Sequence, residues 1–571
     1  MVSFIAQSLI WLATAVGVHY YTRKQASTSM ADDALELERF SCRPFLPKLF
    51  VETPPPPNDP SIVEVTRKVD TFLSDRFSQG DIDGLSVAVV TSVGAIFEKN
   101  WGVQRGNESA SSPPMTSHSI HRISSVVKIF PVMEGLVLEQ KGIISWDDPV
   151  EKYLPDFRYR LDGYAPSKSI AKSEEAPITL FQLASHMSGL GRDWPPGTVH
   201  GFPHDMQGGG PPPTNGLPFP DHAAMLRTII ANRLVTPPFA YPAYSNTGIA
   251  LLGMALVSAN RMASKFPETE PNTFADLIAR DIFEPMGMNS SSFLATEKNK
   301  HLVVVPSLAP EVADQDFLDA MNPAAGQFSS LRDFVTVVET ILNPSHPKSV
   351  LTRYSRDKWL RPVHDFEEDD WTEIGTPWEI IKAPDSNGRL RKIYWKLGAM
   401  AGYHGALAIH PGSSYGVVLL LSGHYPDAAK LTYDVFSIMQ SGIDEALSAI
   451  AHDMYAGTWS SVDATSRASI VVDKGTLYVE KLFLNGSNVL QKFHAPGRLA
   501  LRSSERRDEF RLDTGIPFYN GQRHMGCYPY WNGQDLWGMR NNAPINQLYF
   551  SGSGKERTLH YPSAEVAMTR A

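Results

Sequence analysis

The length of the chain is the feature that most limits how it can fold. A single hydrophobic core stops growing at about 250–300 residues, whereas this chain has 571. We therefore expect one large domain and at least one smaller one. Near residue 455 the sequence pattern changes: short stretches of alternating apolar and polar residues begin, separated by residues typical of turns. This pattern predicts antiparallel strands, and we expect a β-rich C-terminal domain over residues 455–571.

The first residues combine features of two kinds of targeting segment. Leu9–Val18 form an apolar run about as long as a signal-peptide core and short for a membrane span. No basic residue precedes the run, whereas Arg23 and Lys24 follow it, as in an uncleaved anchor. We expect a signal peptide or signal anchor over residues 1–22. The favoured location is outside the cell or in the secretory pathway, and the alternative is membrane anchoring through residues 4–20.

A proline-rich stretch separates this leader from the first regular pattern. "VETPPPPNDP" (51–60) cannot form a helix or a central strand, and we interpret residues 23–60 as a tether. Helical periodicity follows at 61–78, and two strands around a tight turn are expected at 84–102. The large domain is expected over residues 61–450.

Charge and cysteine content exclude some partners and leave others open. There are 52 basic and 61 acidic residues and no basic stripe, so nucleic acid is not expected as a partner. Cys42 and Cys527 have no neighbours at metal-ligand spacing. They are either two unrelated buried thiols or a disulfide formed in an oxidising compartment. Asn107, Asn289 and Asn485 begin N-x-S sequons and are candidates for glycosylation.

The stretch "HRISSVVKIF" (121–130) brings a serine and a lysine together in sequence. Ser125 and Lys128 would share one face of a helix that starts at the serine pair. A serine hydroxyl needs a nearby base, and a lysine serves if burial lowers its pKa. The backbone N–H of Ser125 at the helix start would supply half of an oxyanion hole. Pro131 is expected to kink this helix after its second turn.

Two later stretches offer further site residues. "FAYPAYSNTGIALLG" (239–253) contains Tyr244, which can relay a proton if a lysine stabilises its phenolate. Asn246 in the same stretch would orient the substrate through its amide. In "AMAGYHGALAIHPG" (399–412), Gly405 would let a substrate approach the backbone closely. The N–H of Ala406 would then be the second oxyanion donor.

The order S-x-x-K, Y-x-N and a glycine-bounded strand resembles the serine β-lactamase and penicillin-binding superfamily, in its class C and esterase-like branch. Three further blocks are similar to segments of that family and extend the resemblance over roughly residues 60–450: "DDPVEKYLPDF" (147–157), "ITLFQLASHMSGL" (178–190) and "IFEPMGMNSSSF" (282–293). The resemblance implies an α+β fold, with an antiparallel sheet flanked by helices and a helical region. The extra C-terminal domain and Cys527 look like the fungal members.

The resemblance also implies roles for the first two motifs. Ser125 would be the acylated nucleophile, and Lys128 would assist removal of its proton. Tyr244 would be the general base, first for Ser125 and then for water or another acceptor. Asn246 would orient the substrate. His186, buried by its pattern, is interpreted as a core histidine.

The third family motif, a lysine or histidine followed by a small residue and glycine, is assigned to Tyr403-His404-Gly405. These residues would bind the substrate together with Ala406. Lactamases and peptidases of the family place a lysine at the position of Tyr403, where it pairs with the substrate's carboxylate. Because tyrosine carries no charge at neutral pH, this assignment favours uncharged acyl substrates.

We therefore expect a monomeric serine hydrolase that acts through an acyl-enzyme on an ester or amide of a small molecule, without metal or cofactor. The resemblance to the fungal members implies a substrate similar to secondary metabolites. The first alternative is transfer of the acyl group to an alcohol or amine, and the second is a true β-lactamase or D-alanyl peptidase. A catalytically inactive binding protein is a third alternative, against which the intact Ser125, Lys128 and Tyr244 argue.

Overall fold

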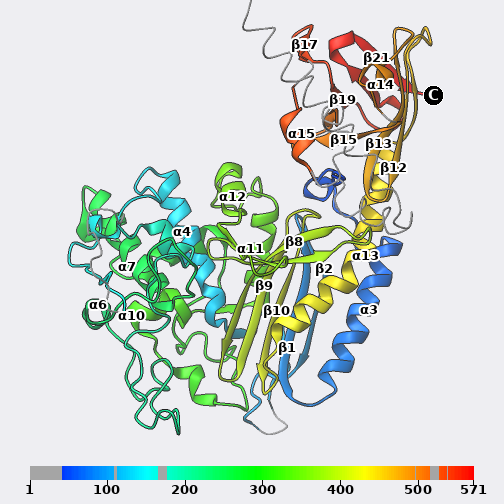
Figure 1. Ribbon diagram of the computed structural model, residues 1–571. Helices are drawn as coiled ribbons and strands as arrows, with labels where there is room; N and C mark the ends of the chain where they lie inside the picture. Colours follow the sequence, from blue (N-terminus) through cyan, green and yellow to red (C-terminus); the bar gives the residue numbers. More distant parts are fainter. Residues whose placement is uncertain (1–41, 109–111, 165–176, 496, 515–525, 536–537) are drawn as a thin grey trace, which may run out of the picture. The chain divides into compact units, whose positions relative to one another are not determined.

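The computed structural model describes residues 42–108, 112–164, 177–495, 497–514, 526–535 and 538–571 (Figure 1). The expected leader or anchor lies outside these ranges, as does the tether up to residue 41. Within them, no helix is both long enough and apolar enough to span a bilayer. The chain divides into two compact units: Lys48–Ala449 forms one, and the described residues from Ile450 to Ala571 form the other together with residues 42–47.

The larger unit is built on an eight-stranded antiparallel sheet with the order β2-β1-β10-β9-β8-β7-β6-β5. The expected strand pair at 84–102 is confirmed as the β1–β2 hairpin. Every residue of β10 is buried, which explains its unbroken apolar sequence. The strands are β1 (Ile82–Thr91), β2 (Gly94–Gly102), β5 (His364–Asp365), β6 (Thr372–Ile374), β7 (Glu379–Pro384), β8 (Leu390–Met400), β9 (Tyr403–His410) and β10 (Tyr415–Gly423).

Helices cover both faces of this sheet. On one face α3 (Pro60–Phe77) and α13 (Ala428–Tyr455) lie side by side (Figure 1). They approach so closely that a Cβ atom at Gly442 would lie 2.6 Å from the carbonyl oxygen of Ser61. On the other face α11 (Leu331–Leu342) packs against β1 and β10. The expected helix at 61–78 is therefore confirmed as α3.

A helical region extends the second face and contributes much of the main cluster of buried apolar side chains. In α4, each residue from 129 to 138 is buried. A capping box formed by Thr179 and Gln182 begins α5, as the T-x-x-Q spacing favours. The helices here are α4 (Ile129–Gln140), α5 (Leu180–Ala184), α6 (His222–Ala231), α7 (Asn246–Ala263), α8 (Phe274–Ile278), α9 (Glu284–Met286), α10 (Leu318–Met321) and α12 (Arg353–Trp359), beside the short strands β3 (Ile120–Arg122) and β4 (Phe328–Ser330).

The expected helix from the serine pair through a kink at Pro131 is wrong in one respect. The segment begins as a 3₁₀ turn, Ser124–Lys128, and α4 starts only at Ile129. Pro131 therefore lies in the first turn of α4, where proline is tolerated, rather than in the interior of a longer helix. The serine and lysine are placed by the tighter 3₁₀ geometry, in which residues three apart lie directly above one another.

The smaller unit is β-rich, as the alternating sequence predicts. Its sheet has the order β12-β11-β21-β20-β19-β16-β15-β13-β14, and an additional β12–β13 pairing closes it in the manner of a barrel. Its elements are β11 (Gly457–Ser460), β12 (Arg467–Asp473), β13 (Thr476–Leu484), β14 (Ser487–Asn488), α14 (Val489–Lys492), β15 (Leu499–Ser503), β16 (Glu509–Leu512), α15 (Tyr528–Asn532), β19 (Gln547–Ser551), β20 (Thr558–Tyr561) and β21 (Val566–Arg570), with a separate β17–β18 pair at Met539–Arg540 and Ala543–Pro544.

Cys42 and Cys527 form a disulfide across 485 residues of sequence. The alternative of two unrelated thiols is therefore wrong. The chain next to Cys42 is also held by Thr476, whose hydroxyl donates to the carbonyl of Pro44 at 2.7 Å. Phe50 is fully buried, so the expected tether is held to the protein at Pro44 and Phe50, whereas most of residues 51–60 are exposed or half-buried.

We predict that removing this disulfide lowers the thermal stability of the smaller unit. A cross-link constrains the unfolded chain, and loss of a native one costs about 2–5 kcal/mol. Calorimetry of the Cys42→Ser/Cys527→Ser variant should show a lower midpoint than the oxidised wild type. Reductant should lower the midpoint of the wild type and leave that of the variant unchanged; an equal effect of reductant on both proteins would contradict the prediction.

Candidate active site

The 3₁₀ turn Ser124–Lys128 presents one side chain to the surface. Within it Ser125 is partly exposed, whereas the other four residues are buried. Ser124, directly before it, has a φ of 51°, which is unusual for a residue with a Cβ and is typical of functional sites. The ammonium nitrogen of Lys128 donates to the hydroxyl of Ser125 at 2.8 Å. The structure thus brings together the pair that the spacing predicts.

Lys128 is placed where its charge is costly. Its side chain is fully buried, and its Nζ also donates to the carbonyl of Ala324 at 2.6 Å. Burial lowers the pKa of Lys128 to about 8; the charge of Tyr244 opposes this shift and that of Lys396 adds to it. A useful fraction of the amine is therefore neutral near pH 7–8 and able to accept a proton from Ser125.

The ring of Tyr244 is surrounded by cations. The ammonium nitrogens of Lys128 and Lys396 lie 5.2 and 5.1 Å from its centroid, and the guanidinium carbon of Arg192 lies 4.7 Å from it. Burial alone would raise the pKa of Tyr244, but the two ammonium groups and a hydrogen bond with Ser125 lower it to about 8. The phenolate is thus accessible near neutral pH, as a general base requires.

Lys396 is a site residue that the sequence analysis missed. It lies on β8, its side chain is 1% exposed, and its ammonium pairs with Glu379 at 2.5 Å. Burial would lower the pKa of Lys396, but Glu379 and Tyr244 raise it, so it remains charged beside the phenol. The segment Lys396-Leu397-Gly398 fits the third family motif except that leucine is not small.

The assignment of that motif to Tyr403-His404-Gly405 is therefore wrong. Tyr403 lies on β9, is fully buried, and donates its hydroxyl to the carbonyl of Val304 at 2.5 Å. Burial raises the pKa of Tyr403, and the side chain has no surface with which to contact a substrate. His404 and Gly405 pair with Ala399 and Gly398 of β8. They therefore lie on the strand next to the one that carries Lys396.

Ala406 cannot be the second oxyanion donor, because β9 lies between β8 and β10 and its amides belong to the sheet. Ala399 is better placed. The β7–β8 pairing ends at Trp395, and the amide of Leu397 donates to the carboxylate of Glu379 at 3.1 Å. The amide of Ala399, two residues further along β8, points to this same edge of the strand. A Cβ atom at Gly398 would lie 2.3 Å from the carbonyl of Ile123, so β8 touches the turn that carries Ser125.

Asn246 and His186 hold the tyrosine segment in place. The amide nitrogen of Asn246 donates to Asp193 at 2.7 Å, while its oxygen is buried and has no partner among the described residues. That oxygen remains available for a substrate or for Lys128. His186 stacks on Tyr244 with ring centroids 4.6 Å apart and accepts a hydrogen bond from the amide of Ser245. The expected core histidine thus also supports the candidate base.

The structure also describes the three predicted sequons. Asn107, Asn289 and Asn485 are all exposed, so each remains a candidate for glycosylation. Among the described parts of the chain, no group of three or more His, Cys, Asp or Glu side chains is arranged to hold a metal ion.

A β-lactamase family model matches residues 65–440, and the chain belongs to this family. It is 35% identical over 313 residues to Beta-lactamase-like protein str6 of Strobilurus tenacellus, covering 53% of this chain and 99% of that protein. It is 24% identical over 462 residues to Probable hydrolase M10 of Phoma sp., covering 75% and 71%. An octameric penicillin-binding protein homologue from Pyrococcus abyssi shares the fold, with a TM-score of 0.50 at 18% identity over 88% of this chain and 99% of that one.

We predict that Lys396→Met moves the rise of kcat/KM with pH to a higher pH. Removing this cation leaves Lys128 as the main charge that lowers the pKa of Tyr244 from its usual value, so less phenolate is present at pH 7. Turnover at pH 7 should fall about tenfold or more, with partial recovery at pH 9. Lys396→Arg keeps the charge and should retain the wild-type profile. An unshifted profile for the methionine variant would show that Lys396 does not act on Tyr244.

Proposed function

We propose that the protein is a serine hydrolase that forms an acyl-enzyme with an ester or amide of a small molecule. The observation that carries this proposal is the 2.8 Å contact between Ser125 Oγ and Lys128 Nζ beside a phenol whose pKa is lowered to about 8. In a chance pair of surface residues, the lysine amine would not be buried, and no cations would surround a neighbouring tyrosine as they surround Tyr244. The family match supports hydrolase chemistry.

The reaction would proceed in two steps. The phenolate of Tyr244, assisted by Lys128, takes the proton of Ser125 as its oxygen attacks the carbonyl carbon. The amides of Ser125 and Ala399 would stabilise the oxyanion. Collapse then breaks the bond to the alcohol or amine, which leaves with the proton. Water attacks the acyl-enzyme, gives its proton to Tyr244 and releases the carboxylic acid, and the hydroxyl of Ser125 is restored.

The ion pairs of Lys396 with Glu379 and of Arg192 with Asp193 support a preference for acyl groups without a carboxylate. Lys396 is buried, its ammonium is paired with Glu379 and it lies 5.1 Å from the ring centroid of Tyr244, so it has little capacity left for an incoming anion. β-Lactams and D-alanyl peptides, which carry that carboxylate, are then poorer substrates than neutral esters. The argument for uncharged acyl groups that the sequence suggests at Tyr403 does not hold, because Tyr403 is buried and donates to the carbonyl of Val304.

Acyl transfer to an alcohol or amine is a second candidate, because a loop lies over the tyrosine segment. Residues 191–220 contain no helix or strand. Their first part is held to the site: Asp193 accepts from Asn246, and the amide of Trp194 donates to Thr247 at 3.1 Å. A loop fixed there would limit the access of water to the acyl-enzyme and favour a bound acceptor.

We also propose that the protein passes through the secretory pathway. The Cys42–Cys527 bond is of the kind that persists in oxidising compartments. The three exposed sequons are consistent with this location. Retention of the protein on membranes after alkaline washing would instead support the anchor over residues 4–20.

We predict that p-nitrophenyl acetate leaves one acetyl group on the wild type and none on Ser125→Ala, measured by intact mass. Only Ser125 has both the amine and the phenol within reach, so hydrolysis of the ester should also fall by about a thousandfold or more. Ser124→Ala is the matched control and should keep the adduct. Equal labelling of wild type and Ser125→Ala would remove Ser125 as the nucleophile.

We predict that hydrolysis and transfer can be separated by the fate of the acyl group. A panel of neutral esters, a cephalosporin and a D-alanyl-D-alanine ester should be offered with and without an alcohol acceptor, and the products measured by mass spectrometry. Free acid that is insensitive to the acceptor indicates a hydrolase. A product ester that saturates with acceptor concentration indicates a transferase. Faster turnover of the cephalosporin than of every neutral ester would contradict the charge argument.

A further inference from the structure

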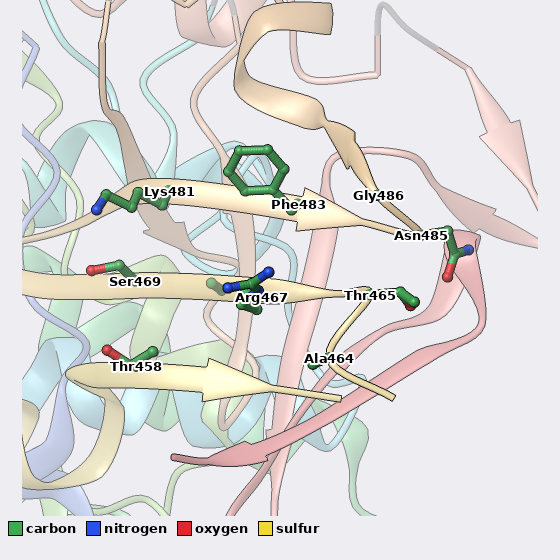
Figure 2. A pocket seen from close by; sticks show the side chains of 10 residues that line it. Thr458, Ala464, Thr465, Arg467, Ser469, Lys481, Phe483, Asn485 and Gly486 are labelled. Atoms are coloured by element: carbon green, nitrogen blue, oxygen red, sulfur yellow. The ribbon is translucent and has the colours of Figure 1, made fainter. Parts of the chain in front are cut away.

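The smaller unit has a pocket of its own, with a volume of about 810 Å³, within the roughly 300–1,000 Å³ of small-molecule sites. Its lining comes only from residues between Thr458 and Gly486, on β11, β12, β13 and the turns that join them. Figure 2 shows Arg467, Lys481 and Phe483 on neighbouring strands of this wall. None of the residues assigned to the active site is among them.

The strand register explains why these side chains share one face. Arg467 lies opposite Phe483, and Ser469 lies opposite Lys481 on the paired strands β12 and β13. Ser469 also lies opposite Thr458 of β11. The residues between them on β12 and β13 are buried in the core of the unit. The pocket face is therefore the outer face of the sheet, and it carries two cations, two hydroxyls and an aromatic ring.

The two cations lack the partners that other cations of this unit have. Arg498 pairs with Asp473 at 2.6 Å and Arg557 with Asp508 at 2.5 Å. The side chains of Arg467 and Lys481 have no ion pair or hydrogen bond among the described residues. They lie diagonally across adjacent strands, where like charges repel, in a chain whose net charge is −9.

The neighbouring carboxylate does not neutralise them. Glu480 is the extra residue of a bulge that interrupts the β12–β13 register after Ser469. It is exposed, and it forms no ion pair with either cation among the described residues. An anion that enters from solvent would therefore meet two uncompensated positive charges.

The rim of the pocket is fixed by hydrogen bonds between two turns. The amide of Gly486 donates to the carbonyl of Thr465 at 2.8 Å, and the amide of Asn485 donates to the hydroxyl of Ser466 at 2.9 Å. Asn485 and Gly486 have φ values of 49° and 78°, as a tight strand connection requires. A rim ordered in this way adds little ordering cost when a ligand binds.

We propose that this pocket binds a small organic anion whose carboxylate or sulfonate is attached to a flat ring. Arg467 and Lys481 would hold the charged group by charge-assisted hydrogen bonds. Phe483, 38% exposed, offers the ring an apolar face. The hydroxyls of Thr458 and Ser469 would complete the polar contacts. The proposal is independent of the hydrolase assignment, because it uses none of the residues of that site.

The test is calorimetric titration of the full chain with naphthalene-2-sulfonate, naphthalene-2-carboxylate and inorganic sulfate. The two ring anions should bind, and sulfate should bind more weakly because it cannot contact Phe483. Arg467→Gln and Lys481→Gln should each weaken binding of both ring anions about tenfold. Phe483→Ala should weaken them while leaving the weak binding of sulfate unchanged. A preference for one ring anion identifies the charged group.

Lys492→Gln is the matched control, since Lys492 is an exposed cation of the same unit outside the pocket. It should bind as the wild type does. Ester hydrolysis and the unfolding midpoint of every variant should equal those of the wild type, which separates this site from the catalytic one. The proposal is overturned if neither ring anion binds, or if Lys492→Gln weakens binding as much as Arg467→Gln does.

Discussion

The placement of a phenol between two buried ammonium groups is the constraint on which the rest of the candidate site depends. Lys128 and Lys396 lie on opposite elements, a 3₁₀ turn and a strand, and each is within about 5.2 Å of the ring centroid of Tyr244. Two buried like charges repel, and each pays a desolvation cost. The negative charges of the Tyr244 phenolate and of Glu379 offset that cost. The two lysines therefore stabilise the deprotonated form of Tyr244.

This requirement explains the architecture around the site. The nucleophile's turn must touch the sheet, and Gly398 allows this because any side chain there would meet the carbonyl of Ile123. The tyrosine must come from the helical region, and His186 fixes its ring by stacking. The catalytic side chains thus come from the 3₁₀ turn, the segment before α7 and strand β8. The core of the larger unit fixes these three elements relative to one another.

Much of this was predictable where the chemistry is local. Ser125 and Lys128 are three residues apart, so a single turn brings them together, and the alternating pattern beyond residue 455 directly predicts strands. Lys396 was not predictable in the same way. It is defined by its distance from Tyr244, 152 positions earlier in the chain, and Leu397 hides the motif. Tyr403 was the competing candidate, and the contacts of the two side chains distinguish them: Lys396 lies 5.1 Å from the ring centroid of Tyr244, whereas Tyr403 donates its hydroxyl to the carbonyl of Val304.

The sequence also could not decide the state of its cysteines, and the outcome has a consequence for biosynthesis. With two cysteines in the whole chain, no wrong pairing within one molecule is possible. Cys42 is nevertheless made 485 residues before its partner, so it leaves the ribosome as a lone thiol while nearly all of the protein is still to come. During that interval its competitors are thiols of other molecules, and faithful closure depends on keeping nascent chains apart.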